Sequence, residues 1–137
     1  MSKVLWVDDD ADGSLLGLGR ILERAGLEVD IAADVSTALN LLEENDYDSI
    51  LLDLLVPQFN SSRGLDPLPG LRVVDFLSKR TVRNRDRNTP KVVILTVMSP
   101  SELEPELRGK DVQIFSKMAI LEREVMEDLK AALKAKS

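Results

Sequence analysis

Short runs of apolar residues alternate along the chain with longer segments in which apolar residues recur every three or four positions. A short apolar run is typical of a strand buried on both faces of a parallel sheet, and the three-to-four spacing is typical of an amphipathic helix. Five segments are of the strand type: 4–7, 28–32, 48–54, 91–96 and 112–116. The second of these alternates apolar and polar residues, as an edge strand does.

A helix is predicted after each strand. The first ends at Gly26, and Asp34 is a good N-cap for the second. The third begins near Leu71 and gives way to a polar, arginine-rich exit from Lys79 to Asn88. Pro105 interrupts the fourth, which is therefore a short helix at best. The last helix has one apolar face, made of Leu121, Val125, Leu129 and Ala132.

The strand-helix order, repeated five times, predicts an α/β fold with a doubly wound parallel sheet and right-handed crossovers. Residues 57–70 are rich in proline, glycine, asparagine and serine and are predicted to be loop. The length of 137 residues fits one domain with a substantial core.

Polar residues stand where the apolar runs end. Asp8 and Asp9 follow the first run, and Asp53, Thr96 and Lys117 end later ones. In an open parallel sheet, ligands bind beyond the carboxyl ends of the strands. We therefore expect these five side chains to meet at one edge of the sheet.

Composition narrows the chemistry of that edge. The chain has no cysteine and no histidine, which excludes disulfides, thiolate catalysis and imidazole bases or ligands. Three neighbouring carboxylates repel one another unless a cation lies between them, and hard oxygen ligands suit Mg²⁺. A nearby lysine and threonine would suit a phosphoryl group, and a carboxylate, with Asp53 as the central candidate, is the available nucleophile.

Charge and hydropathy limit partners and location. The net charge of −6 argues against direct binding to nucleic acid. The chain shows neither a signal sequence nor an apolar stretch of membrane-spanning length, so a cytoplasmic protein that does not bind membranes is expected.

Taken together, these motifs resemble the receiver domain of bacterial response regulators. Residues 4–10 resemble the acidic motif that opens the family, and residues 47–57 resemble its phosphorylation strand with the following proline. Residues 92–96 and 115–117 resemble the strands that carry its switch threonine and its lysine. The resemblance implies a flavodoxin-like sheet of order 2-1-3-4-5 with helices on both faces. It also implies one domain over residues 1–137 without an output domain.

The resemblance also implies roles for the site residues. Asp53 would accept a phosphoryl group from a histidine kinase or a phosphotransfer protein, in a protein that is a phosphoacceptor rather than an enzyme. Asp9, Asp53 and the backbone carbonyl of Leu55 would bind Mg²⁺, with Asp8 acting through water. Thr96 and Lys117 would contact the phosphoryl oxygens. Movement of Thr96 would then pass a conformational signal to a downstream partner protein.

The chain departs from the family near the site. The loop insertion at about 58–69 is longer than the family's loop and lies beside the acceptor. Met118 replaces a proline that usually follows a cis bond, and a cis bond before a non-proline residue costs several kcal/mol, which favours a trans peptide. Val97 is larger than the usual alanine or glycine and is expected to slow access of a phosphodonor. Leu55 and Met98 are apolar, so a long-lived phosphoryl group is expected.

Two alternatives to phosphoryl signalling stay open. Ile114 occupies the position of the usual switch tyrosine, and Phe115 is predicted to face the opposite side of the sheet. A receiver-like interaction module that works weakly or without phosphorylation would fit these features. A phosphatase-type hydrolase fits less well, because such enzymes usually have a second aspartate where this chain has Leu55.

Overall fold

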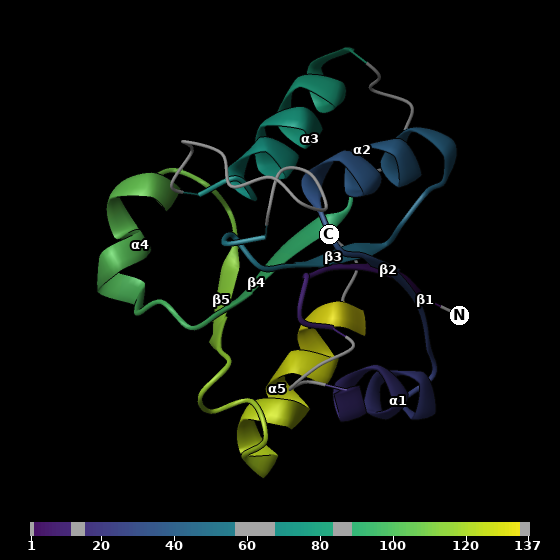
Figure 1. Ribbon diagram of the computed structural model, residues 1–137, viewed down its shortest axis with the longest axis vertical. Coiled ribbons are helices and arrows are strands. Elements are labelled where there is room, and N and C mark those ends of the chain that lie inside the picture. The colour runs from purple at the N-terminus through teal and green to yellow at the C-terminus, as the bar shows by residue number, and fades with distance from the viewer. Residues whose placement is uncertain (1, 12–15, 57–67, 84–88, 135–137) are drawn as a thin grey trace.

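The computed structural model describes residues 2–11, 16–56, 68–83 and 89–134. Strands and helices alternate along the whole chain, as the hydrophobic pattern predicts (Figure 1). The elements are β1 (Ser2–Val7), α1 (Leu16–Arg24), β2 (Leu27–Ala32), α2 (Val35–Glu44), β3 (Ser49–Leu52), α3 (Leu71–Arg83), β4 (Lys91–Thr96), α4 (Pro100–Leu107), β5 (Gln113–Ser116) and α5 (Arg123–Lys134).

The five strands form one parallel sheet in the order β2-β1-β3-β4-β5, which confirms the flavodoxin-like fold. Side chains alternate between its two faces, so neighbouring residues of β3 enter different cores. Ile50 packs with apolar residues of α2, α3 and α4, whereas Leu51 packs with those of α1 and α5. Figure 1 shows the two helix layers on opposite sides of the sheet. Burial of both faces explains why the central strands are almost purely apolar.

Two helix boundaries differ from the predictions. The polar exit predicted to start at Lys79 is instead helical through Arg83, and residues 84–88 lie outside the described part of the chain. One polar side chain there joins two helices, since Arg80 Nη1 of α3 donates a 2.8 Å hydrogen bond to the Leu42 carbonyl of α2. Helix α4 is short, as predicted, but it continues through Pro105 to Leu107. Ser99 and Glu102 form a capping box that stabilises its start.

The prediction that Leu121 faces the core of the last helix is wrong. Leu121 precedes α5 and is 76% exposed, whereas Ile120 is fully buried. Backbone hydrogen bonds from Ala119 to Ser116 and from Glu122 to Ala119 form turns before the helix. Because of these turns, the helix begins only at Arg123, and Ile120 rather than Leu121 lies in the core.

Among the described residues, helices long and apolar enough to span a membrane are absent.

Candidate functional site

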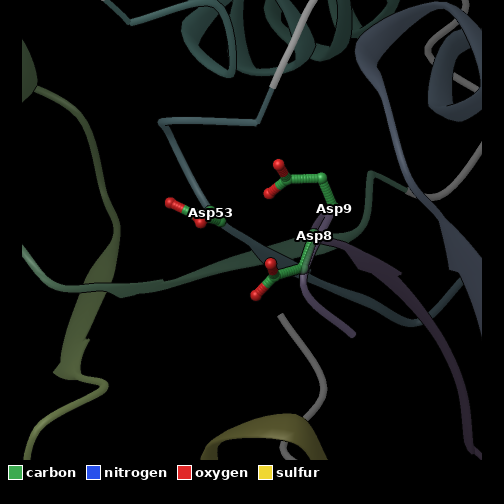
Figure 2. A group of neighbouring side chains, drawn as sticks. All are labelled: Asp8, Asp9 and Asp53. Atoms are coloured by element: carbon green, nitrogen blue, oxygen red, sulfur yellow. The ribbon is translucent and has the colours of Figure 1, made fainter. Parts of the chain in front are cut away.

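Three carboxylates converge at the carboxyl ends of β1 and β3. Asp8 and Asp9 directly follow β1, and Asp53 directly follows β3, which pairs with β1 in parallel. One carboxylate oxygen from each residue lies within 4.8 Å of the others, and Figure 2 shows the three side chains around a common space. Asp8 and Asp53 are buried, whereas Asp9 is exposed to solvent. The acidic cluster is thus open on one side.

Lys117 supplies positive charge to this cluster. Its Nζ lies 2.8 Å from Asp8 Oδ2 and 2.9 Å from Asp53 Oδ2, and its side chain is only 11% exposed. The backbone N–H of Lys117 donates to the Thr96 carbonyl at 2.9 Å, which continues the pairing of β5 with β4 past Ser116. The structure has no cis peptide among its described residues, so the peptide bond between Lys117 and Met118 is trans. With this trans bond, the Lys117 side chain still contacts both carboxylates.

Thr96 is the last residue of β4 and is fully buried. Leu52 of β3 pairs with Ile94 of β4, so continuing the register places Thr96 level with Leu54, at the same edge as Asp53. Its Oγ1 accepts a 3.2 Å hydrogen bond from the Met98 N–H. The hydroxyl therefore ties the end of β4 to the connection that leads into α4.

The backbone after Asp53 also contacts its side chain. The Leu55 N–H donates to Asp53 Oδ1 at 3.0 Å, and the Val56 N–H donates to the Asp53 carbonyl at 3.2 Å. These bonds define a tight turn in which Asp53 Oδ1 faces the Leu55 backbone N–H, and Asp53 Oδ2 accepts from Lys117. The role of the Leu55 carbonyl as a metal ligand stays a prediction.

Burial and charge oppose each other at Asp53. Desolvation raises the pKa of the Asp53 carboxyl, and the nearby Asp8 adds to this, whereas Lys117 and the Leu55 N–H act to lower it. At Lys117, burial acts to lower the pKa of the ammonium group, but its hydrogen bonds to Asp8 and Asp53 outweigh burial, and the pKa is raised. Lys117 is therefore charged at neutral pH and partly offsets the two buried acids.

The donor set fits a divalent cation with a preference for oxygen. Carboxylate oxygens from three residues are close enough to share one ion, and the solvent-exposed Asp9 leaves room for water ligands. Such an ion would separate carboxylates that otherwise repel one another, and Lys117 provides only part of the required positive charge.

Three exposed apolar residues lie close in sequence to the site residues. Val97 and Leu55 are exposed, and Met118, directly after Lys117, is 84% exposed. The long loop predicted at 58–69 falls mostly on residues 57–67, which lie outside the described residues. On β5, Ile114 packs with the α2, α3 and α4 side of the core and Phe115 with the α1 and α5 side, as strand alternation predicts.

The sequence predicts Gly70 to be the glycine that ends the long loop after Pro57. In the structure, its N–H donates a 3.0 Å hydrogen bond to the Leu54 carbonyl, next to Asp53. Only a weak sequence signal pointed to this contact, namely a glycine that directly precedes a predicted helix.

Comparison with known proteins gives one consistent result. No family model matches the chain. The receiver domain of the Francisella response regulator 1452 shares 26% sequence identity, with a TM-score of 0.69 over 98% of both chains. The response regulator TrrA from Thermotoga maritima, solved in complex with Mg²⁺-BeF, is similar in fold, with 23% identity and a TM-score of 0.63 over 96% of this chain and 99% of that one.

A curated protein also matches in sequence. The sensory/regulatory protein RpfC of Xanthomonas campestris pv. campestris is 33% identical over 102 residues, which make up 74% of this chain. The match spans 13% of the length of RpfC.

Proposed function

Because the chain is a receiver domain of the response-regulator family, we propose that it accepts a phosphoryl group on Asp53 in a Mg²⁺-dependent reaction and passes the signal to a partner protein. The donor would be a histidine kinase or a phosphotransfer protein. The observation that supports this most directly is the position of Asp53, which shares the acidic cluster with Asp8 and Asp9 and contacts Lys117 at 2.9 Å.

In the proposed transfer, an oxygen of the Asp53 carboxylate attacks phosphorus while the bond from phosphorus to the donor's histidine nitrogen breaks. Asp8, Asp9, Asp53 and the Leu55 carbonyl would hold Mg²⁺, which supplies positive charge to the transferred phosphoryl oxygens. Lys117 would move its contact from the Asp53 carboxylate to a phosphoryl oxygen. The chain itself thus aligns the nucleophile and neutralises charge, and it needs no separate base.

The signal would begin at Thr96. A phosphoryl group on Asp53 offers acceptor oxygens to the Thr96 hydroxyl, which in the structure accepts from the Met98 N–H. The hydroxyl can donate to the phosphoryl group while it still accepts from Met98, so movement of Thr96 toward the phosphoryl group would pull the connection to α4 with it. The backbone bond from Lys117 to Thr96 would carry the shift to β5. We expect a protein as the partner, because the net charge of −6 disfavours nucleic acid and anionic membrane surfaces. We also propose a cytoplasmic location.

The first test is intact mass after incubation with acetyl phosphate. We expect the mass to increase by one phosphoryl group with Mg²⁺ present and to stay unchanged with EDTA. The Val97→Ala variant is tested in parallel, because a smaller side chain at this exposed position should admit the small donor more readily. A gain that persists in EDTA would contradict the proposed role of the metal.

A second prediction concerns the lifetime of the phosphoryl group. Leu55 is exposed beside the acceptor, and an apolar group there gives attacking water no hydrogen-bond partner. Leu55→Asn is expected to speed loss of the phosphoryl group about tenfold, since an amide can orient water. The decay is followed by mass spectrometry. Leu121→Asn is the matched control, because this exposed leucine precedes α5, and its substitution should leave the lifetime unchanged.

The alternative is an interaction module that keeps the fold but does not depend on phosphorylation. The position of Ile114, packed where an aromatic switch residue would be expected, favours this alternative. Absence of a mass gain in both the wild type and Val97→Ala, together with absence of Mg²⁺ binding, would support it over the phosphoacceptor.

A further inference from the structure

Gly70 lies against the backbone of the proposed phosphoacceptor. A Cβ atom added to it would lie 2.6 Å from Leu54 Cα, 2.8 Å from the Asp53 carbonyl oxygen and 3.1 Å from the Leu54 carbonyl carbon. Distances under 3.0 Å require a shift of one partner, and these partners are backbone atoms that cannot rotate away as a side chain does. Gly70 therefore permits an approach of two backbone segments that other residues would prevent.

The other described glycines do not share this environment. A Cβ on Gly17, Gly26 or Gly109 would meet nothing within 4 Å, and one on Gly19 would meet only the Trp6 ring at 3.7 Å. The crowding at Gly70 is thus specific to the contact between the start of α3 and the end of β3.

The contacted backbone is the turn that orients the site. It carries the Asp53 side chain, the Leu55 N–H that donates to Asp53 Oδ1, and the Leu55 carbonyl. On one side the Asp53 N–H is bonded to the Val7 carbonyl of β1, at 2.9 Å. On the other side the Gly70 N–H is bonded to the Leu54 carbonyl, at 3.0 Å. The turn is held between the strand that leads to Asp8 and the helix that begins after Gly70.

Helix α3 is itself anchored in the core. Val73, Val74 and Leu77 are buried against the sheet, and the Val73 N–H donates to the Gly70 carbonyl. Moving the start of α3 outward to fit a Cβ would expose these side chains. A side chain at position 70 is therefore expected to displace the Asp53–Leu55 turn at least in part.

We propose that Gly70 is a positioning residue: its lack of a side chain lets the start of α3 hold the Asp53–Leu55 turn in register with Asp8 and Asp9. This inference rests on the proposed function, because it concerns the same metal and phosphoacceptor site. It adds a residue that touches neither metal nor phosphoryl group and acts through the backbone of the residues that do.

The test is metal affinity measured in the absence of phosphorylation. We expect Gly70→Ala to weaken Mn²⁺ binding about tenfold, as loss of groups that orient metal ligands does, with free Mn²⁺ counted by electron paramagnetic resonance. Gly17→Ala in α1 is the control for the substitution itself and should bind as the wild type does. Leu129→Ala in α5, on the opposite face of the sheet from α3, is the control for stability, because it should lower the melting temperature and leave the Mn²⁺ affinity of the folded protein unchanged.

The outcomes separate this inference from the proposed function. Unchanged Mn²⁺ affinity in Gly70→Ala, with a lower melting temperature, would show a purely structural glycine and overturn the inference while the phosphoacceptor stands. Absence of Mn²⁺ binding in the wild type would instead overturn the proposed site. Should Gly70→Ala fail to fold, Leu68→Ala is measured instead, because Leu68 is buried in the core cluster that contains Leu54 and its truncation should weaken the packing around the turn without crowding it. Equal affinity in that variant would also overturn the inference.

Discussion

Replacement of Asp53 by asparagine is expected to abolish the gain of a phosphoryl group. An amide is not a nucleophile, and the substitution removes one of three carboxylates from the cluster. We expect the rate to fall at least about a thousandfold, the scale on which loss of an essential catalytic group acts. The measurement is intact mass against time with acetyl phosphate and Mg²⁺. A gain at the wild-type rate would show that another residue is the acceptor.

The same variant should be more stable than the wild type when metal is absent. Burial raises the pKa of Asp53, so the folded state binds its proton more tightly than the unfolded state does. The contribution of this group to stability is therefore present at low pH and lost as pH rises through the folded pKa. At pH 7 the charged carboxylate costs stability, and neutral asparagine removes that cost, which should raise the melting temperature in EDTA.

Asp34→Asn is the matched control for this substitution. Asp34 is also buried, but its side chain caps α2 by accepting from the Thr37 N–H, and asparagine is an equally good cap. This variant should be phosphorylated as the wild type is. A loss of phosphorylation in Asp34→Asn would mean that general damage, not loss of the acceptor, explains the Asp53→Asn result.

The strands were predictable because a central parallel strand must be apolar on both faces. Residues 4–7 and 92–95 show this pattern directly, since all of them are apolar and buried. Helix ends were harder, since they depend on contacts distant in sequence. Arg80 lies in a segment whose polar composition suggested a loop, yet the segment is helical and Arg80 donates a hydrogen bond to Leu42. The turns before Arg123 leave Leu121 exposed.

The placement of the site at one sheet edge also followed from the order of elements. Residues that end parallel strands lie at the same edge of the sheet, which predicts that Asp8, Asp53 and Lys117 are near one another, and the structure places Lys117 in contact with both carboxylates. What the sequence could not show was that Lys117 bridges two carboxylates, or that Gly70 touches the Asp53 backbone. Both contacts depend on how an element packs against its neighbours, which the periodicity of apolar residues does not predict.

Replacement of Lys117 by methionine is expected to lower the free energy of unfolding by about 3 kcal/mol in the absence of metal, because it leaves two buried carboxylates without their shared cation. Methionine keeps a similar length and tests charge more than packing. The measurement is urea unfolding at pH 7 in EDTA. Lys130→Met is the matched control. Its ion pair with Glu127 joins residues on the surface of α5 and should contribute less than about 0.5 kcal/mol.

Two further measurements identify charge as the cause of the Lys117→Met defect. Mg²⁺ should stabilise Lys117→Met more than the wild type, because the ion replaces the missing positive charge and no longer competes with Lys117 for Asp8 and Asp53. Lowering the pH toward 5 should also recover stability. Without Lys117, the pKa of Asp53, already raised by burial, rises further, so the folded state takes up a proton before the unfolded state does. A defect insensitive to both Mg²⁺ and pH would mean that Lys117 stabilises the fold through packing rather than through neutralisation of the acidic cluster.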